Sequence, residues 1–209
     1  MKIETEKDFE LIQAFGPPVL RTKIPEEIVN KLNNYIDDII SNDTKSDKLD
    51  HGKNLVGDVT QEFKLEQSFI SESGWLKFLG QSVQKWFKLS IQRDIKEFKL
   101  IDSWVVRQFK NEYNPIHFHD GDISGVGYLK IPKNLTKNKK KTKTNGTIDF
   151  ISGQKSFLSN SIHNHVPKVG DMIIFPNYLM HTAYPFSVEG ERRSFSFNLE
   201  VDKKISKTI

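Results

Sequence analysis

The chain has 209 residues, a length that favours a single domain with a hydrophobic core. It contains no cysteine, so disulfides and thiolate metal sites are excluded and a metal would need His, Asp or Glu ligands. The N-terminal fifteen residues are too acidic for a signal peptide, and no apolar run approaches the roughly 20 residues that cross a membrane. We therefore expect an intracellular, cytoplasmic protein with no membrane partner.

The net charge of +4 comes from one Lys-rich segment, residues 133–145. This segment, "KNLTKNKKKTKTN", holds six lysines and no acid, and subtracting these six charges from +4 leaves −2 for the rest of the chain. Nucleic-acid-binding proteins usually spread basic residues over a surface, whereas an isolated run is typical of a solvated loop. We expect a loop insertion here and no nucleic-acid partner.

The sequence pattern of the N-terminal part, residues 1–97, predicts a short strand and supporting helices. Pro25 suits the first position of a helix, and Glu26 and Glu27 suit its positive end. Apolar residues at helical spacing continue to Ile39, and a second helix is predicted around residues 72–90. The polar residues 41–60 between them indicate a loop.

From Phe98 onward the sequence favours strands. Short runs rich in β-branched and aromatic residues alternate with turn residues. They are "FKLIDSWVVRQF", "ISGVGYLKI", "GTIDFI", "VGDMIIFP" and "RRSFSFNLEV". The predicted fold is mainly β with flanking helices, a sandwich or barrel formed by residues 98–201 within one domain.

Candidate metal ligands gather in "HFHDGD", where His117, His119, Asp120 and Asp122 fall within six residues. Along a strand, residues two apart point to the same side, so both imidazoles would face one point. His181 follows the predicted strand "MIIF", which Pro176 ends, and a short connector, and it could join them at the mouth of the strand. His163 and His165 lie in a polar stretch without a strand pattern and are expected at the surface.

The last predicted strand, "GERRSFSFNLEV", carries a candidate carboxylate site. Alternation puts Arg192 on one side with Ser194, whereas Arg193 shares the other side with phenylalanines and should reach water with its charged end. An arginine facing inward needs an anionic partner, and a guanidinium binds a carboxylate through two parallel hydrogen bonds. A metal site beside such an arginine suggests a small carboxylic acid as ligand.

These motifs together resemble the Fe(II)- and 2-oxoglutarate-dependent oxygenases. "YNPIHFHDGDISGVGYLKIP", "GTIDFI", "VGDMIIFPNYLMHTAYPF" and "GERRSFSFN" are similar to the prolyl-4-hydroxylase-like branch, including uncharacterised bacterial and tailed-phage members. The resemblance covers about residues 98–200, with a weaker match at "GPPVL". It implies a double-stranded β-helix, which is a cupin-like jelly-roll barrel with the metal at its mouth.

The resemblance also implies site residues, cofactors and a reaction. Fe(II), 2-oxoglutarate as co-substrate, and O2 would together hydroxylate a C–H bond of a substrate that the sequence does not identify, either a peptide or protein or a small metabolite. The metal ligands would be His117, His119 and His181, and the distant carboxylate of 2-oxoglutarate would contact Arg192, Ser194 and Tyr128.

One position departs from the family pattern, which is His-x-Asp followed by a distant His. His119 occupies the place of the carboxylate, so the ligands are three histidines, or two histidines with oxygen supplied by water, Asp120 or Asp122. Two other functions stay open on the same fold. They are a cupin-type metalloenzyme and a jelly-roll binding or viral structural protein without catalysis.

Overall fold

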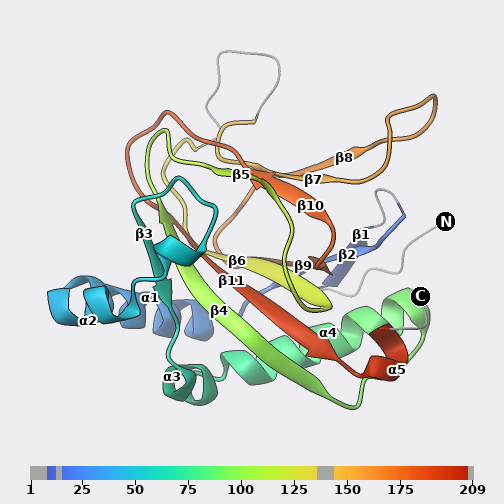
Figure 1. Cartoon of the computed structure of the whole chain (residues 1–209), viewed down its shortest axis with the longest axis horizontal. Helices are drawn as coiled ribbons and strands as arrows, with labels where there is room; N and C mark the ends of the chain where they lie inside the picture. Colours follow the sequence, from blue (N-terminus) through green and yellow to red (C-terminus); the bar gives the residue numbers. More distant parts are fainter. Residues whose placement is uncertain (1–8, 13–15, 136–143, 207–209) are drawn as a thin grey trace.

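The structure is a computed structural model that describes residues 9–12, 16–135 and 144–206. Most of the Lys-rich segment predicted as a loop insertion lies outside the described residues. Within the described ranges, the strands form two antiparallel sheets that face each other without closing (Figure 1). This confirms the predicted fold class, mainly β with flanking helices.

The larger sheet has seven strands in the described residues, in the order β1-β2-β9-β6-β11-β4-β3. Their bounds are β1 Phe9–Ile12, β2 Val19–Lys23, β9 Asp171–Pro176, β6 Ile123–Lys130, β11 Arg192–Val201, β4 Phe98–Gln108 and β3 Gln61–Lys64. The smaller sheet has the order β5-β10-β7-β8. Its strands are β5 Asn114–His117, β10 Met180–Ala183, β7 Ile148–Ile151 and β8 Ile162–His165.

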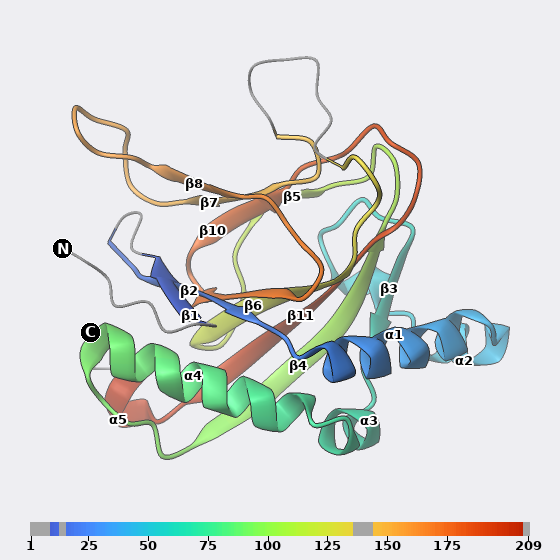
Figure 2. The ribbon, with the colours of Figure 1, turned by 180° about the vertical axis from the view of Figure 1, so that it is seen from behind.

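Helices cover the face of the larger sheet that points away from the smaller sheet (Figures 1 and 2). The helices are α1 Glu26–Ile40, α2 Asp43–Leu49, α3 Gln67–Glu72, α4 Trp75–Ile91 and α5 Lys203–Ser206. The main hydrophobic core lies between α1, α4 and the sheet. No helix in the described ranges combines the length and apolar character needed to cross a membrane.

The predicted helices are present, with differences at their ends. Pro25 precedes the first helix, which begins at Glu26 and not at the proline. The second prediction, residues 72–90, corresponds to α4, and Gly74 separates it from α3 because its φ of 82° cannot continue a right-handed helix. The expectation that residues 41–60 form only a loop is wrong. Asn42 caps α2 by accepting a hydrogen bond from the Lys45 backbone N–H.

The two faces of β11 pack against different layers. Phe195 and Phe197 are fully buried, and their rings lie 5.4 and 5.8 Å from the ring of Trp75 on α4. On the neighbouring strand β6, a Cβ at Gly125 or Gly127 would lie only 2.2 or 2.3 Å from these phenylalanine rings. The glycines of "SGVGY" therefore make room for the helix-facing aromatic layer.

Arg193 lies on this helix-facing side, but its guanidinium does not reach water as expected. It is 2% exposed and pairs with Glu191 at 2.8 Å and with Asp37 on α1 at 2.8 Å. Glu191 also pairs with Arg107 at 2.7 Å. Burial raises the pKa of the Glu191 carboxyl, but hydrogen bonds from the two arginines outweigh it and lower the pKa to about 2.

We expect Glu191→Ala to lower the free energy of unfolding by about 3 kcal/mol at pH 7, because the buried Arg193 and the partly buried Arg107 lose a shared partner. The folded pKa lies below the ordinary value of 4.5. The stabilisation is therefore complete above that pH and is lost as the pH falls toward 2. Urea unfolding followed by tryptophan fluorescence at pH 7 and at lower pH measures both effects.

Glu189→Ala is the matched control, because Glu189 pairs with Lys110 at 2.7 Å but is 84% exposed in its side chain. Its removal should change the free energy of unfolding by less than about 0.5 kcal/mol. Equal effects for the two substitutions would contradict a structural role for the buried cluster.

Candidate metal centre

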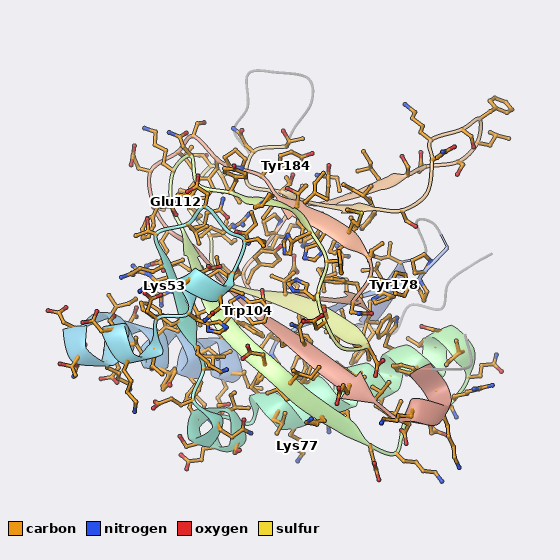
Figure 3. The ribbon with its side chains drawn as sticks, in the orientation of Figure 1. Lys53, Lys77, Trp104, Glu112, Tyr178 and Tyr184 are labelled. Atoms are coloured by element: carbon orange, nitrogen blue, oxygen red, sulfur yellow. The ribbon has the colours of Figure 1, made fainter. Side chains whose placement is uncertain are left out.

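A cavity of about 410 Å³ lies between the two sheets and contains the predicted site. Trp104 of β4, Tyr128 of β6 and Ser194 of β11 line it from the larger sheet, and His117 and His181 line it from β5 and β10. Trp104 lies near the centre of the molecule (Figure 3). Most of the site, including His117 and His181, is thus built on paired strands, which hold side chains more rigidly than loops do.

Strand pairing brings two of the histidines together from positions far apart in the sequence. β5 and β10 are antiparallel, and His117 lies directly opposite His181 in their register. Their ring centroids are 4.3 Å apart. His181 follows the short connector between β9 and β10, as expected, and is the second residue of β10.

His119 reaches the same point by a different route. The prediction that one strand carries both imidazoles is wrong, because β5 ends at His117. The His119 backbone N–H donates to the Asn177 carbonyl at 3.1 Å, and Asn177 Nδ2 donates to the His119 carbonyl at 3.0 Å. This two-way contact fixes the bend that turns His119 inward, and Phe118 between the histidines faces out, as expected, with 65% exposure.

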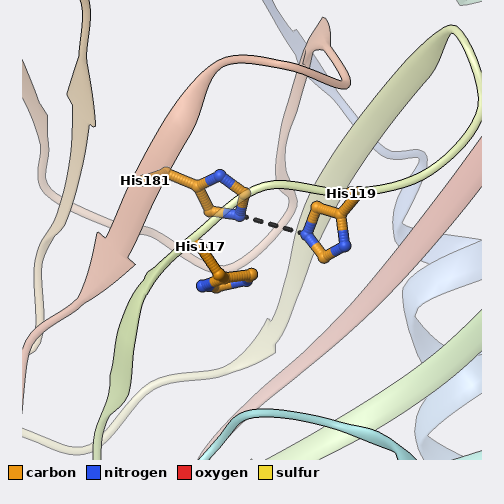
Figure 4. Close-up of side chains that lie close together, drawn as sticks. All are labelled: His117, His119 and His181. Carbon is orange, nitrogen blue, oxygen red and sulfur yellow. Dashed lines mark hydrogen bonds between the residues drawn. The ribbon is translucent and has the colours of Figure 1, made fainter.

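The three imidazoles converge on one point (Figure 4). One nitrogen of each lies within 4.8 Å of the others, and His119 Nε2 is 3.2 Å from His181 Nε2. The Nδ1 atom of His117 donates to the Pro115 carbonyl at 2.7 Å, and that of His181 donates to the Leu179 carbonyl at 2.9 Å. Since a carbonyl only accepts, both rings carry their proton on Nδ1 and present the Nε2 lone pair to the cluster.

Burial keeps these imidazoles neutral at pH 7, the form that binds a divalent metal. Burial lowers the pKa of His117 despite the opposing hydrogen bond to Pro115. Burial, with a smaller effect of His117, lowers the pKa of His119 to about 4. Burial and then the two neighbouring imidazoles hold the pKa of His181 well below its usual range. The donor set of three neutral, preoriented nitrogens fits a first-row transition metal such as Fe(II).

The two carboxylates considered as alternative ligands lie outside this cluster. Asp122 Oδ2 accepts a hydrogen bond from the Val201 backbone N–H at 2.9 Å, and Asp122 borders a different pocket. Asp120 lines the cavity but is exposed.

Arg192 lines the same cavity and is 2% exposed. Its Nη1 donates to the Gly146 carbonyl at 2.9 Å, and its Nη2 donates to Gln108 Oε1. Its Nε is buried without a hydrogen-bond partner, and no carboxylate of the described residues pairs with the guanidinium. A buried cation in this state requires an anion that the described protein does not supply, and a ligand carboxylate would fit that requirement.

Two hydroxyl groups border this guanidinium. Tyr128 on β6 lies opposite Ser194 on β11, and both side chains line the cavity. Burial raises the pKa of the Tyr128 phenol to about 12, although Arg192 opposes the shift. The phenol is therefore a neutral hydrogen-bond donor at pH 7.

The expectation that His163 and His165 are surface residues fails for His165. It is 5% exposed on β8, with its Nε2 atom 3.3 Å from Asp171 Oδ2. The ring of His163 stacks on Phe150 with a centroid distance of 6.2 Å. β8 was not predicted because "IHNH" shows no hydrophobic alternation, yet pairing with β7 orders it.

Two supporting residues were missed by the sequence analysis. Asn177 holds the His119 backbone, and Gln108 holds Arg192. Asn177 carries a weak signal, since Asn after Pro176 at the end of a strand is typical of a turn that uses its side chain. Gln108 lies at the end of β4 among residues that pack as an ordinary strand, and no pattern marks it.

We expect His117→Ala and His181→Ala each to abolish retention of Fe(II), because either change leaves an incomplete set of protein ligands. Metal content after anaerobic loading and desalting, measured by mass spectrometry, tests this. His163→Ala is the matched control and should retain the metal, since His163 stacks outside the cluster. A greater loss in the control than in His117→Ala would reject the assigned ligands.

His119→Asp should retain Fe(II), because a carboxylate at this position gives two histidines and one acid, a set that binds iron in many oxygenases. His119→Ala should weaken binding more, since no donor replaces the imidazole. Competition with a metal-binding dye measures both affinities. Equal affinities for the wild type and His119→Ala would show that His119 is not a ligand.

Comparisons with known proteins agree with this geometry. Residues 102–198 match the family model described as "Putative 2OG-Fe(II) oxygenase". No curated protein matches the sequence. Among solved structures, a Pseudomonas putida prolyl-4-hydroxylase is 14% identical with a TM-score of 0.60, and the match covers 86% of this chain and 91% of that one.

Two further structures show the same fold. HygX from Streptomyces hygroscopicus, solved with nickel and 2-oxoglutarate bound, is 11% identical with a TM-score of 0.56, over 87% of this chain and 82% of that one. A prolyl hydroxylase from Trichoplax adhaerens was solved in complex with a hypoxia inducible factor peptide fragment. It is 10% identical with a TM-score of 0.54, and the match covers 96% of this chain and 86% of that one. Residues 102–198 are therefore similar to the Fe(II)- and 2-oxoglutarate-dependent oxygenases, and the chain has the fold of solved prolyl-4-hydroxylases.

Proposed function

We propose that the protein hydroxylates a C–H bond of an organic substrate, using Fe(II), O2 and 2-oxoglutarate. One observation carries this proposal. A single cavity holds three converging neutral histidines and a buried arginine that has no carboxylate partner among the described residues. A ligand with a metal-binding end and a distant carboxylate would fit both groups at once, and 2-oxoglutarate has this form.

The arginine end of the cavity would bind and orient the co-substrate. Arg192 has a free Nε–H and is held in place by Gly146 and Gln108, so it would bind a carboxylate with little loss of side-chain entropy. Tyr128 and Ser194 would add hydroxyl donors to the same carboxylate. This end of the site is therefore preorganised for a single carboxylate group.

The histidines would hold the metal, with His117 and His181 oriented by their Nδ1 contacts to backbone carbonyls. When bound, Fe(II) with 2-oxoglutarate and O2 supplies the oxidising chemistry for C–H hydroxylation. The protein contributes ligand geometry and a partly enclosed cavity between two sheets, which limits water around the reacting group.

The substrate would enter beside the histidines. Trp104 lies 5.6 Å from His119 between ring centroids, and exposed Phe118 lines the same cavity. The Trichoplax enzyme was solved with a peptide, which makes a peptide one candidate substrate for this chain. A small metabolite is the other.

Anaerobic titration with Fe(II) and then 2-oxoglutarate tests the proposal directly. We expect a weak visible charge-transfer band when the keto acid chelates the metal. Admission of O2 should then release succinate, measured by mass spectrometry, even without the main substrate. Absence of both signals in protein that retains iron would reject the proposed function.

Arg192→Ala should weaken 2-oxoglutarate binding about 30- to 1,000-fold, the equivalent of about 2–4 kcal/mol for a lost charge-assisted pair. Iron retention should persist, because Arg192 is not a ligand. Anaerobic calorimetry of 2-oxoglutarate binding to the iron-loaded protein provides the measurement.

Arg193→Ala is the matched neighbour and should show the opposite behaviour. It removes the pairs with Glu191 and Asp37 on the helix-facing side, so the melting temperature should fall while 2-oxoglutarate affinity stays nearly normal. The reverse pattern would mean that the two arginines have exchanged faces.

A further inference from the structure

The cavity has a second wall with unpaired acceptor atoms, which the iron and the co-substrate do not explain. Glu62 on β3 and Asn114 on β5 both line the cavity. Glu62 is 2% exposed, and its Oε2 atom is buried without a hydrogen-bond partner. The Oδ1 atom of Asn114 is also buried without a partner.

The two side chains meet at one place, beside Gly57. A Cβ built on Gly57 would lie 2.2 Å from Asn114 Oδ1 and 3.3 Å from Glu62 Oε1. The absence of a side chain at residue 57 thus lets Asn114 Oδ1 pack against this backbone, close to the Glu62 carboxyl. Asn114 lies three residues before the metal-binding candidate His117, so this wall belongs to the same chamber as the histidines.

The Glu62 carboxyl on this wall has no cationic partner among the described residues. Glu62 forms no ion pair within the described residues, whereas Asp102, another acid of the lining, pairs with His51 and Lys64 at 3.3 Å each. Burial, with a smaller effect of Asp50, raises the pKa of Glu62 to about 7. A buried carboxyl without a partner is costly for folding, and such groups are typical of functional sites.

Resting on the function proposed above, we propose that Glu62 and Asn114 form a substrate subsite that takes a cationic nitrogen group, such as a primary ammonium. An ammonium has three donors and no acceptor, so it matches a wall of carboxylate and amide oxygens. It would also neutralise Glu62, as the carboxylate of the co-substrate would neutralise Arg192. The substrate is then a basic, amine-bearing molecule or side chain.

Binding of n-butylammonium, compared with n-butanol, tests this without turnover. The protein is loaded with Mn(II) and 2-oxoglutarate under nitrogen, and the relaxation enhancement of the probe protons reports binding near the metal. Wild type should bind n-butylammonium about tenfold or more tightly than n-butanol, because a hydrogen bond to a charged group is worth that much. Glu62→Gln should remove this preference and retain the shape of the wall.

Glu97→Gln is the matched control, since Glu97 is exposed and lies outside the cavity lining. It should keep the wild-type preference. Gly57→Ala provides a second variant that leaves the charge in place. Its methyl group would lie 2.2 Å from Asn114 Oδ1, so it should displace this acceptor and weaken n-butylammonium binding, which tests the subsite even if Glu62→Gln does not fold.

Binding of 2-oxoglutarate to the Mn(II) protein is measured first, so that the two proposals fail separately. Wild type that does not bind 2-oxoglutarate would overturn the proposed function. Wild type that binds 2-oxoglutarate but holds n-butanol as tightly as n-butylammonium would overturn only the amine subsite.

Discussion

The site depends on the alternation of side chains along β11, which pairs with β4 on one side and β6 on the other. Because neighbouring residues on a strand point oppositely, Arg192 faces the cavity and Arg193 faces the helices. Each buried guanidinium then requires its own partners. Arg193 obtains them from Glu191 and Asp37, whereas Arg192 has only neutral partners and an unpaired Nε. A shift of one residue in the register of β11 would exchange the arginine that forms the structural ion pairs with the arginine that faces the cavity.

The sequence predicts this strand well because its faces differ in chemistry. Serines beside one arginine and phenylalanines beside the other define the register, and "SGVGY" on β6 supplies the glycines that the phenylalanines require. The charged end of Arg193 could not be placed in the same way, because its partner Asp37 lies 156 residues away on α1. Local alternation gives the face of a residue but not its distant partner.

The histidine cluster shows a similar limit. The three residues were predicted, but their positions depend on pairing between β5 and β10 and on the contact of His119 with Asn177. Such non-local contacts leave no periodic signal in a four-residue strand. β8 and Glu62 were missed for the same reason. The polar letters of "IHNH" and "QEFK" do not reveal which side chains face a cavity.

Three histidine ligands would change the electrostatics of the proposed metal centre. An imidazole in place of a carboxylate would leave a bound metal one unit of charge more positive, and Arg192 adds to the same cavity a second cation without a carboxylate partner among the described residues. A dianionic co-substrate therefore compensates both ends, and its binding should depend more strongly on charge than in a site with an acidic ligand. The Glu62 carboxyl lies on the wall of the same cavity where the amine subsite is proposed. The cavity is thus divided into a region that favours an anion and a region that favours a cation, with the metal ligands in the same chamber.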